Sequence, residues 1–311
     1  MPYDHRKTVR RALALALAAT GCCATLAGCG ATQASPQEGG KQPSPPSASA
    51  GRPTRPPAAS TGAPSAEAGG TGGSTGSVDA SGANPGSRSL AGRTVVIDPG
   101  HNPGNFRHSK DINQKVDIGT NRKECDTTGT STNAGYTEAS FTLDVSHRLR
   151  DLLTARGAKV VLTHDAERPW GPCIDERARI GNAAAADAVV SVHADGSAVG
   201  NRGFHVILPA RVRGGSADTA DIVGPSRELG EGIADHFART TGTEPSNYLG
   251  SGTGLDVRDD LGGLNLSTVP KVFVECGNMR DPKDAQLLTS ATWRQKAARG
   301  IADGIATYLE G

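Results

Sequence analysis

The sequence predicts an α/β domain with one mostly parallel sheet of about six strands and helices on both faces. Short apolar runs, rich in β-branched residues, alternate with helix-like stretches from Gly92 onward. The runs are almost continuously apolar instead of alternating with polar residues, which is typical of parallel strands buried on both faces. We find no internal repeat and no sign of a second folded domain after Gly92, so we expect a single domain.

The first half of this domain contains three expected strands and two expected helices. The run Val-Val-Ile-Asp at 95–98 predicts a strand, and a polar stretch rich in Asn, Thr and Gly follows up to Tyr136. The segment 137–156 is expected to be a helix because its apolar residues recur at helical spacing, and Gly157 is a typical stop. A strand at 159–163, a helix at 174–186 and a strand at 188–192 come next.

The second half continues the alternation up to the C-terminus. A strand is expected at 203–208, flanked by Gly and Pro, and a helix at 227–239 with apolar residues at helical spacing. The stretch 242–266 has no clear pattern. An apolar strand at 271–276 follows, and 284–309 is expected to be largely helical and to close the domain.

The N-terminus has the pattern of an export signal. Four basic residues precede a short apolar run at 12–19, which is too short to span a membrane. The tetrapeptide Leu-Ala-Gly-Cys that ends at Cys29 resembles a bacterial lipobox, in which the cysteine is lipidated. We therefore expect residues 1–29 to be a signal peptide and Cys29 to carry a lipid that anchors the protein to the outer face of the membrane. A plain secretory signal, cut near the same place, is the alternative.

Residues 30–91 are expected to form a disordered linker. They consist mainly of Ser, Gly, Pro, Ala and Thr, and such a segment buries too little apolar surface to offset its ordering entropy. Residues 92–311 would then be a folded domain that works at some distance from the membrane. The net charge of +1 gives no basic field for nucleic acid, and we expect a monomer.

Three cysteines lie in the expected domain. Cys125 and Cys173 occur in polar, turn-rich stretches, whereas Cys276 lies inside an apolar strand. In an oxidising compartment three cysteines predict one bridge and one free thiol. We therefore expect a disulfide between Cys125 and Cys173, with Cys276 free.

Chemically active side chains follow the expected strands. His101 comes after the strand that starts at Val95, His193 follows the strand at 188–192, and Glu275 ends the run Val-Phe-Val. Glu138 lies in the first turn of the helix expected at 137–156. The carboxyl ends of parallel strands meet at one edge of a sheet, so these groups are expected to converge. Each signal alone is weak, and His108 is a possible substitute ligand.

Two imidazoles and one carboxylate form the protein ligand set of a catalytic Zn²⁺ site, whose fourth position holds water. A second carboxylate that is not a ligand moves the proton of that water to the leaving nitrogen. Glu138 and Glu275 can divide these two roles. A carboxylate in a buried strand, such as Glu275, is costly to desolvate without a function.

The same residues lie in motifs that resemble the zinc-dependent N-acetylmuramoyl-L-alanine amidases of bacterial cell-wall turnover, most closely their mycobacterial and actinobacterial branch. The matching motifs are VVIDPGHNPGN, TEASFTLDV, VVSVHAD and VFVECGNM. The resemblance implies that His101, Glu138 and His193 bind zinc and that Glu275 is catalytic. It also implies hydrolysis of the amide bond between N-acetylmuramic acid and L-alanine in peptidoglycan or muropeptides.

Other roles follow less directly. Arg258 and Asn278 lie near the expected cleft and are candidates for substrate contact, although surface or fold-supporting roles are equally compatible with their positions. Asp98 is expected to orient the turn or a ligand histidine. Two other functions stay open at this point: a zinc peptidase that cuts another bond of the stem peptide, and a non-catalytic peptidoglycan-binding lipoprotein. Four residues that bind metal and move protons favour an enzyme, since a binding module needs no proton shuttle.

Overall fold

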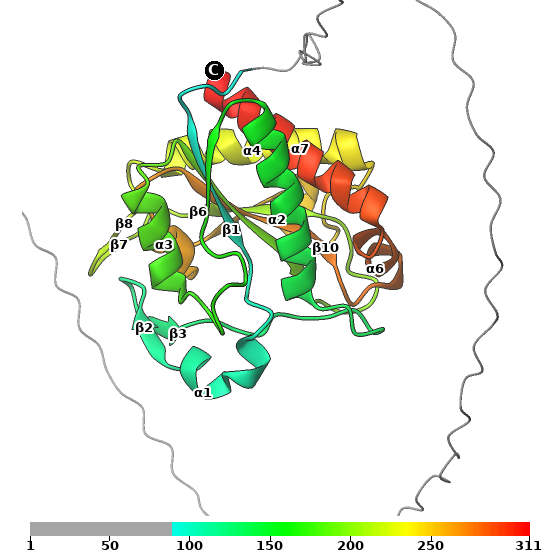
Figure 1. Cartoon of the computed structure of the whole chain (residues 1–311), viewed down its shortest axis with the longest axis horizontal. Helices are drawn as coiled ribbons and strands as arrows, with labels where there is room; N and C mark the ends of the chain where they lie inside the picture. The colour runs from blue at the N-terminus through cyan, green and yellow to red at the C-terminus, as the bar shows by residue number, and fades with distance from the viewer. Residues whose placement is uncertain (1–88) are drawn as a thin grey trace, which may run out of the picture. The chain divides into compact units, whose positions relative to one another are not determined.

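A six-stranded sheet forms the centre of the part of the chain that the structure describes, residues 89–311 of a computed structural model (Figure 1). Its strand order is β4-β1-β5-β10-β6-β9. The first four of these strands are parallel to one another, β6 is antiparallel to β10, and β9 is parallel to β6. This confirms the predicted mostly parallel sheet. The strands are β1 (Thr94–Pro99), β4 (Lys159–Leu162), β5 (Ala188–Asp195), β6 (His205–Pro209), β9 (Leu255–Arg258) and β10 (Lys271–Asn278).

The two faces of the sheet are covered unequally. The larger core lies on the face to which Val190 and Val274 point, and helices α2 (Glu138–Ala155), α4 (Val223–Thr241) and α7 (Ala291–Glu310) cover it. Close packing of α4 on α7 requires glycine, because a Cβ on Gly304 would lie 2.5 Å from Cα of Ile233. Figure 1 shows these long helices grouped on one side of the sheet.

The opposite face is covered by the shorter helices α3 (Ile174–Ala183) and α5 (Gly262–Asn265). Because side chains alternate along a strand, the residues between the core positions point to this face. They include Asp98, His193 and Glu275. In the ladder between β5 and β10, His193 is paired with Glu275. Parallel register therefore brings two of the expected site residues side by side on the less covered face.

Small elements fill the stretches that the sequence left unassigned. The polar stretch after His101 contains α1 (Ser109–Ile112) and a hairpin of β2 (Lys115–Asp117) and β3 (Arg122–Glu124). The stretch 242–266 supplies β9 and α5. The expected C-terminal helix is two helices, because Asp281 caps α6 (Pro282–Leu288) and Ser290 starts α7 with a second cap. A further hairpin, β7 (Arg213–Gly214) with β8 (Ala217–Asp218), precedes α4.

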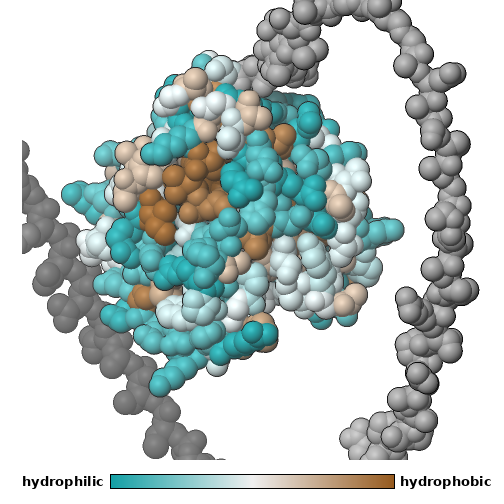
Figure 2. All heavy atoms as spheres, in the orientation of Figure 1, coloured by the Kyte–Doolittle hydropathy of each residue, from teal (hydrophilic) through white to brown (hydrophobic). Residues whose placement is uncertain are grey.

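The expected signal peptide and nearly all of the expected linker lie outside the described residues. Within 89–311, none of the helices combines the length and the hydropathy needed to cross a membrane. The face in view in Figure 2 is mostly hydrophilic, and its largest apolar area lies left of centre.

Candidate metal centre

The turn after β1 presents His101 in a strained backbone conformation. Its φ is +61°, in the left-handed region that non-glycine residues rarely adopt. The preceding Gly100 donates its N–H to Val192 O (3.0 Å), and its carbonyl accepts from Thr142 Oγ1 (2.6 Å). A Cβ at Gly100 would lie 2.4 Å from the ring of His193. Glycine is therefore required for the two histidines to come together.

Three side chains from separate elements converge at this point. Oε1 of Glu138 lies 3.1 Å from Nε2 of His101 and 3.0 Å from Nδ1 of His193. The ligand atoms all lie within 4.8 Å of one another, and in residues 89–311 this is the group of His and carboxylate side chains that fits a metal ion. Glu138 is buried, and the two histidines are partly exposed. The site is therefore open on the side of the histidines.

The hydrogen bonds around the ligands favour metal binding. His101 Nδ1 lies 3.1 Å from Thr127 O, which can only accept. This contact favours a proton on Nδ1 and leaves Nε2, which faces Glu138 Oε1 at 3.1 Å, as the nitrogen that would bind a metal. Glu138 Oε2 accepts from Thr130 N (2.9 Å). Burial raises the pKa of Glu138. The two neighbouring histidines lower it by more than burial raises it, so the pKa lies below its usual value. The donors are thus a carboxylate and two imidazole nitrogens, which suit zinc.

The other candidate ligand, His108, is not part of this group. It lies 3.1 Å from Asp111 through its Nδ1 and stands 6.5 Å from the ring of Trp170. The geometry therefore favours His101, which comes from the turn after β1, over the alternative ligand His108.

Glu275 lines the same cleft as the three ligands. Its Oε2 is buried and has no hydrogen-bond partner. Burial and the neighbouring negative charges of Glu138 and Asp195 raise its pKa well above the usual value, against the opposing charge of Arg258. A raised pKa makes this carboxylate a better proton acceptor, which suits a residue that takes a proton from water and passes it to a leaving nitrogen.

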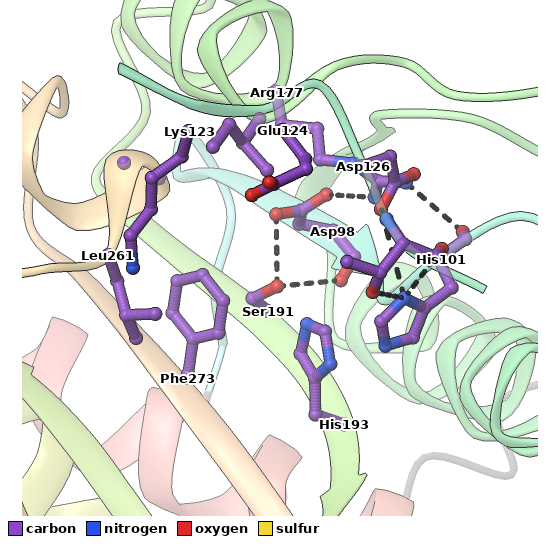
Figure 3. A pocket seen from close by; sticks show the side chains of 14 residues that line it. Asp98, His101, Lys123, Glu124, Asp126, Arg177, Ser191, His193, Leu261 and Phe273 are labelled. Carbon is purple, nitrogen blue, oxygen red and sulfur yellow. Dashed lines mark hydrogen bonds and ion pairs between the residues drawn. The ribbon is translucent and has the colours of Figure 1, made fainter. Parts of the chain in front are cut away.

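The role expected for Asp98 is carried out through another residue. Asp98 is buried and does not contact the ring of His101; instead it accepts from Arg177 Nη1 (2.8 Å) and from Lys271 Nζ (3.1 Å). Arg177 in turn donates to His101 O (3.1 Å). The sequence does not point to Arg177, because a charged residue on a polar helix is normally expected at the surface. Figure 3 shows Arg177 between the two carboxylates of Asp98 and Asp126.

The two candidate substrate residues differ in their surroundings. Arg258 lines the metal cleft and forms an ion pair with Asp260 through Nε and Nη2, each at 2.8 Å. Asn278 is fully buried, and its amide donates to Ala198 O and Asn201 O. Its Oδ1 accepts from two backbone N–H groups. Of the two roles open to Asn278, these contacts favour fold support, because the side chain holds two loops together.

A side cavity of about 260 Å³ adjoins the metal centre. His101 and His193 lie on its border with the metal cleft, and Phe273 stacks on His193 with ring centroids 5.2 Å apart. The hairpin residue Lys123 closes the far side, where its Nζ donates to Asp260 (2.9 Å). The cavity extends from the metal centre to the buried Asp98 (Figure 3).

A disulfide joins Cys125 to Cys173, and Cys276 is a buried free thiol. Cys173 precedes α3, and Ile174 N donates to Cys125 O (2.7 Å). The bridge therefore links the segment that contacts His101 to the helix that carries Arg177.

Comparison with known proteins gives a consistent match. Residues 95–307 match the family model described as N-acetylmuramoyl-L-alanine amidase. The chain is 41% identical over 221 residues to the N-acetylmuramoyl-L-alanine amidase Rv3717 of Mycobacterium tuberculosis. The aligned region covers 71% of this chain and 88% of the relative.

Two solved structures are similar in both sequence and fold. The amidase Ami1 from Mycobacterium smegmatis is 39% identical with a TM-score of 0.65, covering 71% of this chain and 99% of that one. The apo form of Ami1 from Mycobacterium abscessus is 40% identical with a TM-score of 0.65, covering 71% and 100%.

Proposed function

Because the chain belongs to the N-acetylmuramoyl-L-alanine amidase family, we propose that His101, Glu138 and His193 bind Zn²⁺ and that Glu275 is the catalytic carboxylate. The chain is a hydrolase that acts on peptidoglycan, and its work is therefore extracytoplasmic. The bond cut is the amide between N-acetylmuramic acid and the L-alanine of the stem peptide. The observation that carries the proposal is the cleft itself, which is lined by the three ligands and by Glu275.

Bound zinc supplies Lewis acidity, which activates water and polarises the carbonyl of the scissile amide. Three contacts of the chain prepare its ligands for this. Thr127 O fixes the proton of the His101 ring on Nδ1, Thr130 N fixes one oxygen of Glu138, and Ala194 N donates to the other oxygen at 3.2 Å. These contacts orient the ligands before the metal arrives.

Glu275 moves the proton. Its position in the ladder directly beside His193 places it next to the ligand set, and its orphaned Oε2 is free to accept a proton from water. The burial and the negative neighbours that raise its pKa make Glu275 a stronger base toward the water proton, and the protonated carboxyl then gives that proton to the departing nitrogen of L-alanine. The products are a muramoyl carboxylate and a peptide with a free amine.

The remaining parts of the proposal concern substrate contact and place in the cell. Arg258 faces the cleft and keeps Nη1 outside its ion pair with Asp260, which suits contact with a substrate carboxylate or carbonyl. Residues 1–29 would be a signal peptide, 30–91 a linker, and 92–311 the catalytic domain. A lipid on Cys29 would hold the protein as a monomer at the outer face of the membrane, within reach of the wall.

The decisive experiment is digestion of defined muropeptides by the zinc-loaded full chain, with the products weighed by mass spectrometry. We expect an intact stem peptide with a free L-alanine amine and a glycan that keeps its lactyl carboxylate. Cleavage at an internal peptide bond, with the muramoyl amide untouched, would instead identify a zinc peptidase. Binding without any cleavage would identify a non-catalytic peptidoglycan-binding lipoprotein.

A further inference from the structure

The guanidinium of Arg177 uses all of its donors in the fold. Nε donates to Pro172 O (2.9 Å), and Nη1 donates to Asp98 Oδ1 (2.8 Å) and Pro99 O (2.6 Å). Nη2 donates to His101 O (3.1 Å) and to Asp126 Oδ2 (3.0 Å). The residue is 4% exposed. A planar fork with five fixed donors is a geometry that lysine cannot reproduce.

Three of these bonds reach the segment around His101 from two directions. The first direction is the backbone, where Arg177 holds Pro99 O and His101 O on either side of the turn. His101 has a φ of +61°, and a non-glycine residue keeps such a conformation only when its surroundings over-determine it. Arg177 supplies this constraint from α3, on the face of the sheet that carries the site.

The second direction is the imidazole ring. Arg177 fixes Oδ2 of Asp126, whose Oδ1 accepts from Thr127 N (2.8 Å). The carbonyl of Thr127 in turn lies 3.1 Å from Nδ1 of His101, and Asp126 Oδ1 itself lies 3.7 Å from that nitrogen. One guanidinium thus sets both the backbone of His101 and the partner of its ring.

The charges of this cluster balance. Asp98 and Asp126 face Arg177, and Lys271, which is fully buried, donates its ammonium to Asp98 as well. Two anions and two cations therefore share a buried site. Such a network is costly to bury, and removing one member leaves an unpaired charge. Its position directly behind the metal centre indicates a purpose beyond fold stability.

We propose that Arg177 is a positioning residue for the metal: it holds His101 in the orientation that binds Zn²⁺, through the turn carbonyls and through Asp126. This inference rests on the proposed zinc site and adds a determinant of its affinity. Partners of this kind change metal affinity by about 10- to 100-fold when they are replaced.

The test compares Arg177→Lys with the matched control Arg156→Lys in the full chain. Arg156 also donates to a backbone carbonyl, Ala302 O (3.1 Å), and pairs with Asp303, but it joins α2 to α7 outside the metal centre. The measurements are the zinc dissociation constant from chelator competition, the visible spectrum of the Co²⁺ form, and the melting temperature of the metal-free protein.

We expect Arg177→Lys to weaken zinc binding by about 10- to 100-fold and to change the Co²⁺ spectrum, while Arg156→Lys keeps both. A purely structural role would lower the metal-free melting temperature and leave zinc affinity within about twofold of the wild type, and that result overturns the proposal. If Arg177→Lys does not fold, Asp126→Asn tests the same contacts from the other end, with the same two outcomes. A wild-type chain that binds no zinc would reject the proposed metal site itself.

Discussion

Oε1 of Glu138 lies 3.0 Å from Nδ1 of His193 and is shared with Nε2 of His101. A carboxylate at the start of α2 is thus placed between imidazoles from the ends of two neighbouring strands. Each proposed ligand comes from a different element, so the group forms only when the sheet and α2 are assembled. Loss of any one ligand leaves two, which is fewer than catalytic zinc sites use.

Glu138→Ala and His193→Ala should each lose zinc and activity together. Only two protein ligands would remain in either variant, and metal affinity falls steeply with ligand number. His108→Ala is the control, since His108 pairs with Asp111 and is not in the ligand group. Zinc per chain, measured on protein purified without added metal, should be about one in the wild type and the control. Full zinc occupancy in His193→Ala would show that the ligand set is wrong.

Glu275→Gln should keep zinc and lose turnover. The amide has the shape of the carboxyl group but cannot accept a proton, so turnover on muropeptides should fall by roughly 10²- to 10⁴-fold. Glu244→Gln, an exposed carboxylate outside the cleft, serves as the control for charge alone. Zinc content and cleavage are measured on the same preparations. Near-normal turnover in Glu275→Gln would remove this residue from the mechanism, and loss of zinc would make it a ligand instead.

Most of the site could be predicted because its residues stand at strand ends. His101, His193 and Glu275 each follow an apolar run, and parallel strands carry their ends to one edge of the sheet. The alternation of side chains then places Asp98, His193 and Glu275 on one face. The sequence pattern and the geometry of the sheet agree here, so the position of these residues in the folded chain could be predicted.

Other features depend on contacts that no local pattern records. Arg177 looks like a surface residue of a polar helix, and only the folded chain shows its bonds to a turn 76 residues away. Asn278 follows Glu275 closely, yet its side chain is buried and donates to the loop carbonyls of Ala198 and Asn201. The strand β9 is short and sits at the sheet edge, beside β6 alone, so its sequence lacks the long apolar run of a central strand.

Reduction of the bridge between Cys125 and Cys173 should lower stability more than it lowers zinc content. The bridge closes a loop of 48 residues, for which the chain-entropy account gives roughly 4 kcal/mol. Neither cysteine is a proposed ligand. The melting temperature and zinc content are measured with and without reductant. A Cys125→Ser/Cys173→Ser double variant is the control. Its melting temperature should be lower than that of the wild type and should not change when reductant is added. An equal drop in the double variant on reduction would place the effect elsewhere.

The last prediction concerns pH and the metal-free protein. Burial and the charges of Glu138 and Asp195 raise the pKa of Glu275 above its ordinary value of 4.5. The folded state therefore binds this proton more tightly than the unfolded state does. Its contribution to stability is fully present below pH 4.5 and is lost as the pH rises through the raised pKa of the folded state.

Glu275→Gln removes this loss, because glutamine stays neutral at every pH. We expect the metal-free variant to match the wild type near pH 4 and to become the more stable of the two as the pH rises above 4.5. Chemical denaturation of both proteins across this range, in the presence of a chelator, measures the difference. A constant difference at all pH values would mean that Glu275 titrates alike in the folded and unfolded chains, and a growing advantage of the wild type would mean that its carboxylate is stabilised by the fold. The expected gain of the variant would instead show that the cleft holds this carboxylate at a cost, as a proton-transfer group in an enzyme requires.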